Sequence, residues 1–110
     1  MDLLNIPFSV IDWSKIPETT HPGETGFATW KTFATGNIRV RMVVYSPGYL
    51  ADHWCARGHV IHILEGEMVS ELRNGTKNRM IAGMSYLMGN DPVNPHRSST
   101  INGVTLFITD

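Results

Sequence analysis

Apolar and polar side chains alternate along much of this chain with a period of two. The clearest example is 38–45, where two rows of alternate residues can be separated. One row is Ile38, Val40, Met42 and Val44, and the other is Arg39, Arg41, Val43 and Tyr45. Because successive side chains of a β-strand point to opposite faces, this period predicts a half-buried strand. The same argument predicts a strand at 104–109, with Val104, Leu106 and Ile108 on its inward face.

Glycine and proline divide the rest of the chain into short segments. The longest segment free of both is 37–46, ten residues, so neither a helical bundle nor a membrane span of about 20 residues is expected. Turn residues at Gly36-Asn37, Asn74-Gly75 (type I′) and Asn102-Gly103 indicate hairpins. Further strands are predicted at 9–13, 27–35, 59–65, 67–73, 78–82, 85–88 and 96–101. Short connections of this kind predict antiparallel pairing and an all-β fold of about nine to eleven strands.

Composition narrows the class of protein. A chain of 110 residues with 42% hydrophobic and 17% charged residues is expected to form one folded domain, 1–110. Its least regular part is 1–25, and the β-barrel is expected at 26–110. The net charge of −1 and the absence of a basic block argue against nucleic-acid or anionic-membrane partners. The single cysteine favours a reducing compartment, and the first residues lack a signal-peptide pattern, so we expect a cytoplasmic protein.

Four of the five histidines and the only cysteine fall within 53–96. In an extended segment, His53 and Cys55 point to the same side. His59 begins the next predicted strand, with Ile61 and Ile63 on its face and His62 on the other. Imidazole and thiolate groups suit Zn, Fe or Ni. The candidate metal ligands are His53, Cys55, His59 and His96.

The spacing of these residues resembles the first motif of the cupin superfamily. In that motif a glycine is followed by His-x-His, a glutamate and a second glycine. Gly48, His53, Cys55, His59 and Gly66 occupy these places, with Cys55 at the second histidine and His59 at the glutamate. Residues 83–96 resemble the second motif, with His96 at its metal-binding histidine. The resemblance implies a double-stranded β-helix of jelly-roll type, with a divalent transition metal inside the barrel.

A finer resemblance involves the segments Ile6-Pro7-Phe8, Asp12-Trp13-Ser14 and Asp52-His53-Trp54-Cys55. They are similar to small bacterial single-domain cupins named for an Asp-His-Cys-Trp motif, which implies a homodimer but no assigned reaction. Three histidines resemble the three-His site of thiol dioxygenase-like cupins. Adding the Cys55 thiolate would give a closed site, more usual for structural zinc.

Several other residues have two interpretations each. Asp52 is either a hydrogen-bond partner of a ligand histidine or an ordinary turn residue. Arg39, Arg41 and Arg97 could bind a carboxylate, but we expect Arg39 and Arg41 to face solvent and Arg97 to point away from His96. Trp54, Tyr86 and Met88 line either a pocket or the core. His21 is expected to be solvated, and Glu65 and Glu67 to have no catalytic role.

Two hypotheses about function remain open from the sequence alone. In the first, the protein is a metal-binding cupin that acts on a small organic substrate. In the second, it binds a small molecule without catalysis, with a structural metal or none. An open coordination position favours the first hypothesis, and a filled four-ligand site favours the second. Fold alone does not decide between them.

Overall fold

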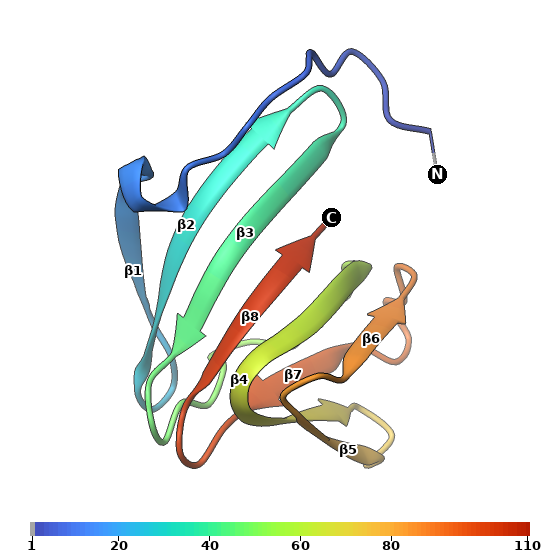
Figure 1. The fold of residues 1–110 in the computed structure, drawn as a ribbon. Coiled ribbons are helices and arrows are strands. Elements are labelled where there is room, and N and C mark those ends of the chain that lie inside the picture. Colours follow the sequence, from blue (N-terminus) through green and yellow to red (C-terminus); the bar gives the residue numbers. More distant parts are fainter. Residues whose placement is uncertain (1) are drawn as a thin grey trace.

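The computed structural model describes residues 2–110, which form a curved, all-antiparallel sheet (Figure 1). A short 3₁₀ turn, η1 (Trp13–Lys15), precedes eight strands. The strands are β1 (Glu18–Pro22), β2 (Phe27–Thr35), β3 (Ile38–Tyr45), β4 (His59–Leu72), β5 (Lys77–Ile81), β6 (Ser85–Met88), β7 (His96–Ser99) and β8 (Val104–Thr109). Their order is β1-β2-β3-β8-β4-β5, and β6 and β7 also pair with β4. The predicted all-β, antiparallel architecture is confirmed. The expected nine to eleven strands are too many, because the two strands predicted on either side of Gly66 are one strand, β4, among the eight of the described residues.

The long strand β4 joins the two parts of the sheet. Its first half pairs with β8 and β6, and its second half pairs with β5 and β7. The change of partners occurs after a register shift between Ile63 and Glu65, next to Gly66 at φ 83°. A Cβ at Gly66 would collide with the carbonyl oxygen of Gly103, so glycine is required by both conformation and space. The sequence predicts two strands separated at Gly66, whereas the structure has one bent strand.

The core lies between the two parts of the sheet. Its fully buried side chains include Val43, Ile63, Met68 and Leu106. The inward face predicted for β8 is confirmed, because Val104, Leu106 and Ile108 are all buried. A second buried cluster of Ala28, Tyr49 and Ala51 lies next to Trp30 and Tyr45.

In β3, the row of alternate side chains that contains the arginines faces inward, which is the opposite of what is expected from the sequence. Arg41 faces inward with Val43 and is only 5% exposed. The register explains this, because Arg41 pairs with Ile108 and Val43 with Leu106, both buried residues of β8. Residues directly opposite in an antiparallel pair share a face. The expectation that Arg39 and Arg41 face solvent is therefore wrong.

The N-terminal quarter of the chain is more regular than the sequence predicts. No strand forms at 9–13. Asp12 instead caps η1 by accepting a hydrogen bond from the Ser14 amide at 3.1 Å. Strand β1 forms at Glu18–Pro22, where no strand is predicted. Its His21 is half-buried and stacks on Trp30 with 3.8 Å between ring centroids, so the expected solvated histidine is wrong.

Two of the three predicted hairpin turns form. The hairpin predicted at Asn102-Gly103 is wrong, because this turn connects β7 to β8 but β7 pairs with β4, and β8 pairs with β3 and β4. Gly36-Asn37 joins β2 and β3, where Thr35 pairs with Ile38. The turn after β4 forms at Asn74-Gly75, but it is not of type I′, because only Gly75 has positive φ there. Leu72 and Thr76 enclose a three-residue loop instead, with Gly75 N–H donating to the Leu72 carbonyl at 2.9 Å.

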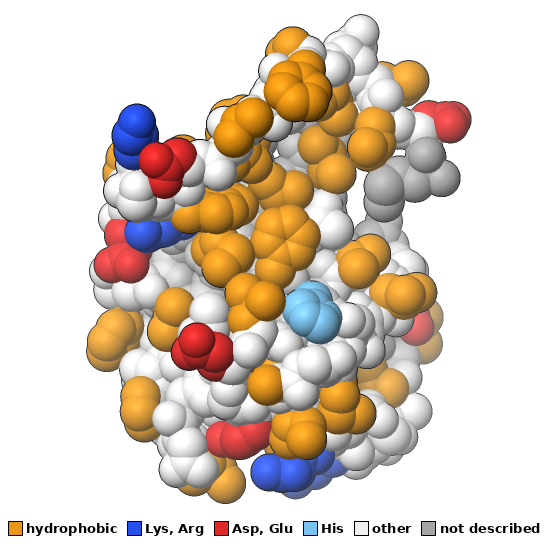
Figure 2. All heavy atoms as spheres, viewed as in Figure 1, with side chains coloured by type: hydrophobic (Ala, Val, Ile, Leu, Met, Phe, Trp, Pro, Cys, Tyr) orange, Lys and Arg blue, Asp and Glu red, His pale blue; other side chains and the backbone are white. Residues whose placement is uncertain are grey.

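Apolar side chains also gather on the outside of the molecule. Figure 2, which has the same viewpoint as Figure 1, shows them over the N-terminal segment and the neighbouring strands. Trp13 of η1 meets Phe107 of β8 edge-on at 6.5 Å, while Phe8 and Val10 are almost fully exposed. Within residues 2–110, no helix is long and apolar enough to cross a membrane.

Candidate metal centre

Backbone pairing places Cys55 beside His96. Although Cys55 lies in the loop before β4, its amide donates to the His96 carbonyl at 2.7 Å. The His96 amide donates back to the Cys55 carbonyl at 2.9 Å. The two residues therefore form an isolated antiparallel bridge, and residues paired in this way have neighbouring side chains.

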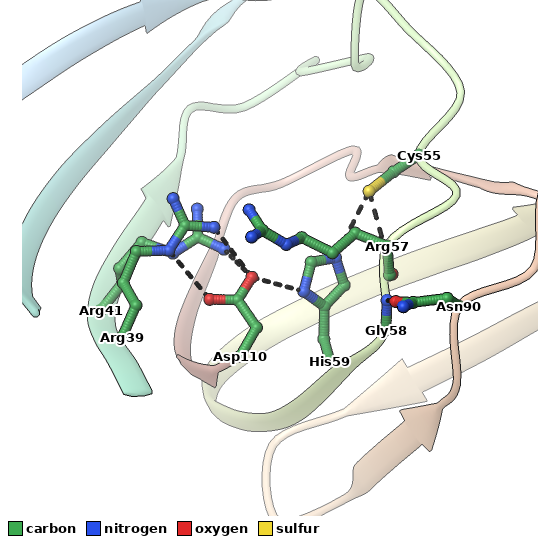
Figure 3. A network of polar contacts seen from close by, with 8 residues as sticks. All are labelled: Arg39, Arg41, Cys55, Arg57, Gly58, His59, Asn90 and Asp110. Atoms are coloured by element: carbon green, nitrogen blue, oxygen red, sulfur yellow. Dashed lines mark hydrogen bonds and ion pairs between the residues drawn. The ribbon is translucent and has the colours of Figure 1, made fainter. Parts of the chain in front are cut away.

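The same loop delivers His59, the first residue of β4. The Gly58 amide donates to Asn90 Oδ1 at 2.6 Å, and a Cβ at Gly58 would lie only 2.7 Å from the Met88 carbonyl oxygen. This close approach fixes the loop against 88–90. Figure 3 shows the Cys55 sulfur directed at the His59 ring, and Sγ lies 3.4 Å from Nε2.

Three candidate ligands are thus brought together. Ligand atoms of Cys55, His59 and His96 all lie within 4.8 Å of one another. The rings of His59 and His96 are nearly perpendicular, with centroids 5.2 Å apart. In a tetrahedral zinc site, bonds of about 2.3 Å to sulfur and about 2.0 Å to nitrogen place the two donors about 3.5 Å apart. The separation between Cys55 Sγ and His59 Nε2 fits this value.

His53 lies outside this group, although its motif position predicts a ligand. Its side chain is 70% exposed, at the rim of the adjacent cavity. Its Nδ1 and Asp52 Oδ1 are 2.7 Å apart. The hydrogen bond from His53 lowers the pKa of Asp52. Asp52 therefore does support a histidine, but at the rim. His62 lies on the opposite face of β4, as predicted, and its Nδ1 contacts Ser85 Oγ at 2.6 Å.

Asp110, which is not among the residues predicted from the sequence, supports His59. Its Oδ2 lies 2.9 Å from His59 Nδ1, and Arg39 and Arg41 reach the same carboxylate at 2.8 and 3.3 Å (Figure 3). Burial opposes ionisation, but the Arg39 hydrogen bond and the charges of both arginines hold the pKa of Asp110 at about 2. Asp110 is therefore an anion, which can only accept a hydrogen bond, so His59 Nδ1 must carry the proton and donate. That tautomer leaves the lone pair of Nε2 facing Cys55.

Both histidines of the group favour the neutral form that can ligate a metal. Burial lowers the pKa of His96 to about 4, and the neighbouring histidines add to this effect. Burial also lowers the pKa of His59, although Asp110 acts in the opposite direction. His96 Nδ1 is moreover buried without a hydrogen-bond partner. The unpaired ring nitrogen of His96, the thiol of Cys55 and the oriented imidazole of His59 form a set of ligands that suits a transition metal.

The group opens into a cavity of about 280 Å³. Its wall is formed mainly by aromatic, apolar and arginine side chains, including Trp30, Tyr45, Tyr49, Val43 and Ile61. Of the three residues predicted to line a pocket or the core, Tyr86 packs against the core, and both Tyr86 and Met88 line a separate cavity. Trp54 lies outside the cavity wall, and the guanidinium groups of Arg73 and Arg97 lie 4.9 and 4.7 Å from the centre of its ring. The cavity is therefore shaped by β2, β3, the loop before β4, and residues of β4, β7 and β8.

The fold is that of the cupins, as the motif spacing predicts. No protein-family model matches the sequence, and no curated protein matches it. Among solved structures, an RmlC-like cupin from Shewanella frigidimarina is similar over 96% of this chain and 92% of its own, with TM-score 0.74 and 14% identity. A predicted oxalate decarboxylase from Thermotoga maritima is similar over 92% of this chain and 96% of its own, with TM-score 0.75 and 16% identity.

A third similar structure is Fe(II)-HppE with an alternative substrate. The likeness covers 94% of this chain and 60% of that one, with TM-score 0.74 and 11% identity. At such identities the likeness establishes the fold and not the activity. The narrower resemblance to the small bacterial single-domain cupins stays a prediction.

Proposed function

We propose that this protein binds one divalent transition metal through Cys55 Sγ, His59 Nε2 and a ring nitrogen of His96. The observation that carries the proposal is the chain of contacts from Asp110 through His59 to Cys55. A carboxylate that orients a ligand histidine from behind is the usual arrangement around protein-bound metals. One thiolate and two imidazoles favour Zn, Fe or Ni over Mg or Ca.

The protein's own residues supply orientation and a protected binding space. Asp110 keeps the proton on His59 Nδ1, while the Cys55–His96 bridge fixes the other two donors. Three protein ligands leave a coordination position open, which is typical of catalytic rather than structural sites. The proposed function is therefore to bind and act on a small organic molecule in the cavity. A metal bound there would supply a Lewis acid or a redox centre.

The outer face supports a second part of the proposal, a cytoplasmic homodimer. Val44, Val60 and Leu87 are all partly exposed on the outside of the sheet. The free thiol of Cys55 is compatible with a reducing compartment. Sedimentation equilibrium of the untagged protein tests the dimer directly. A single species with the mass of one chain at micromolar concentration would contradict it.

The metal is tested by elemental analysis of untagged protein purified without chelator, followed by titration of the metal-free protein with Co²⁺. We expect about one equivalent per chain and a thiolate-to-cobalt absorption band. Cys55→Ser should remove the band, and His96→Ala should remove tight binding. His62→Ala is the matched control, since His62 lies on the outer face. His53→Ala should retain one equivalent.

The outcomes separate the hypotheses. Full binding by both Cys55→Ser and His96→Ala would contradict the proposed ligands. Loss of the metal in His53→Ala would indicate a filled four-ligand site, and so the non-catalytic alternative. Failure to bind any of Zn²⁺, Fe²⁺, Ni²⁺ or Co²⁺ would leave the histidines as polar lining of a binding cavity.

A further inference from the structure

Apart from the candidate metal ligands, the charged side chains in the cavity wall are all positive. Four arginines line it, Arg39, Arg41, Arg57 and Arg97, so the expectation that Arg97 points away from the site is wrong. No aspartate or glutamate of the described residues lines the cavity. Burial raises the pKa of both Tyr45 and Tyr49, so these wall residues stay neutral. A low-dielectric wall of this kind concentrates positive potential inside the cavity.

The four arginines differ in how their charge is balanced. Arg97 lies 3.6 Å from Glu24 and 3.7 Å from Glu71, so two acids outside the cavity compensate it. Arg39 and Arg41 share the single carboxylate of Asp110. Within residues 2–110, Arg57 forms no ion pair. Figure 3 shows its guanidinium extending past His59 in the direction of Arg39 and Arg41.

Arg41 retains an unused donor. The residue is 5% exposed, and its Nε is buried without a hydrogen-bond partner. Burial lowers the pKa of Arg41, and the charges of Arg39 and Arg57 lower it further. A buried donor without an acceptor is unfavourable, because its bond to water is lost and not replaced. An acceptor oxygen entering the cavity would relieve both this cost and the repulsion among the guanidinium groups.

The remaining wall indicates an organic body attached to that acceptor. The Tyr45 and Tyr49 rings stack at 4.2 Å, and Trp30 lies under the Arg41 guanidinium at 4.5 Å. Val43 and Ile61 add apolar surface. Since a water occupies about 30 Å³, a cavity of about 280 Å³ holds on the order of ten non-hydrogen atoms.

We propose that the cavity binds a small organic carboxylate, held by Arg41 and Arg57 and directed toward Cys55, His59 and His96. The planar fork of a guanidinium matches a carboxylate, and charge-assisted hydrogen bonds are about twice as strong as neutral ones. Arg39 contributes charge while it holds Asp110. This carboxylate is the substrate class of the proposed function and rests on it for the metal, but the arginine site itself needs no metal.

The test uses a series of monocarboxylates from acetate to benzoate, each paired with its neutral amide. Binding to the full chain is measured by calorimetry at low ionic strength, in metal-loaded and chelator-treated samples. The variant is Arg57→Gln, which leaves the Asp110 contacts intact. The control is Arg79→Gln on β5, an exposed arginine outside the cavity that carries the same charge. Inorganic phosphate is included as a second anion.

We expect at least one carboxylate to bind roughly tenfold more tightly than its amide, and Arg57→Gln to remove roughly that factor while Arg79→Gln does not. Equal binding of acids and amides, no binding by any acid, or an unchanged Arg57→Gln variant would overturn the proposal. Phosphate binding more tightly than every carboxylate would overturn the carboxylate class. If the protein takes up no metal but binds acids in a manner that depends on Arg57, the anion site is supported and the proposed function is contradicted. If the protein takes up metal but does not prefer acids to amides, the proposed function is supported and the anion site is contradicted.

Discussion

Two carboxylates, Glu67 and Asp110, are held in contrasting ways. Glu67 Oε1 accepts hydrogen bonds from the amides of Ile101 and Asn102, at 3.1 and 2.9 Å, and from Thr100 Oγ1 at 3.0 Å. The Asn102 amide contributes most to the lowered pKa of Glu67. Asp110 is instead surrounded by charged or chargeable side chains, Arg39, Arg41 and His59.

The difference separates a structural joint from the candidate metal centre. The donors around Glu67 belong to one turn, and the carboxylate joins that turn to β4 near its bend. The partners around Asp110 also line the cavity. Arg41 has a free Nε, and His59 has an Nε2 directed at Cys55. A buried carboxylate held by cations beside a cavity is thus a stronger indication of function than its lowered pKa alone.

The largest expected effect comes from Asp110→Asn. The carboxylate is 2% exposed, and its removal leaves two arginines without a counter-charge. We expect the free energy of unfolding of the metal-free protein to fall by about 3 kcal/mol, measured by urea denaturation. Metal affinity should fall roughly 10–100-fold because His59 loses its orienting partner. Unchanged metal affinity in a folded variant would contradict the role assigned to Asp110.

Glu67→Gln should have a smaller and purely structural effect. One amide oxygen can still accept hydrogen bonds, but its bonds to the turn are no longer charge-assisted. We expect a loss of about 1 kcal/mol in unfolding free energy, with cobalt affinity equal to that of the wild type. A tenfold change in cobalt affinity would remove the distinction between the two carboxylates.

The stability of the protein should fall in acid because both carboxylates, Asp110 and Glu67, become protonated. The folded-state pKa of each is below its ordinary value, 3.8 for Asp110 and 4.5 for Glu67. Their stabilisation is therefore complete above those ordinary values and is lost as pH falls, for Asp110 down to about 2. Thermal denaturation of the metal-free protein between neutral pH and pH 2 should show this decline. Asp110→Asn should decline less steeply, and an identical slope would show that the Asp110 carboxylate is not a cause of the acid sensitivity.

The smallest effect is expected for His62→Gln. The side chain lies on the outer face of β4 and contacts Ser85 there. Unfolding free energy should change by no more than about 0.5 kcal/mol, and metal content should stay the same. Metal loss in this variant, seen by elemental analysis, would place a ligand outside the Cys55, His59 and His96 group.

The sequence predicts the cupin fold and three members of the cluster, because motif spacing and strand period are local properties. Asp110 could have been found by the same period. It continues the inward series of Val104, Leu106 and Ile108, two residues further along. A search for apolar alternation ends at Ile108, because the next inward position carries a charge.

Other features depend on contacts that no local pattern encodes. The period of two in β3 separates two rows of side chains, but only pairing with β8 shows that the row of Arg41 and Val43 faces inward. The buried positive charge of Arg41 is compensated only after folding has brought Asp110 beside it. His53 matches the motif, but the path of its loop directs it to the rim and brings Cys55 to His96 instead.

The bend of β4 has a consequence for local opening of the fold. Because β4 pairs with four other strands, separating it would disrupt most of the sheet. Its amides should exchange with solvent deuterium only through global unfolding, whereas β1, which pairs with β2 alone, should exchange through smaller openings. His59 therefore belongs to the most slowly exchanging strand. The donor cluster is attached to the part of the sheet that opens least often.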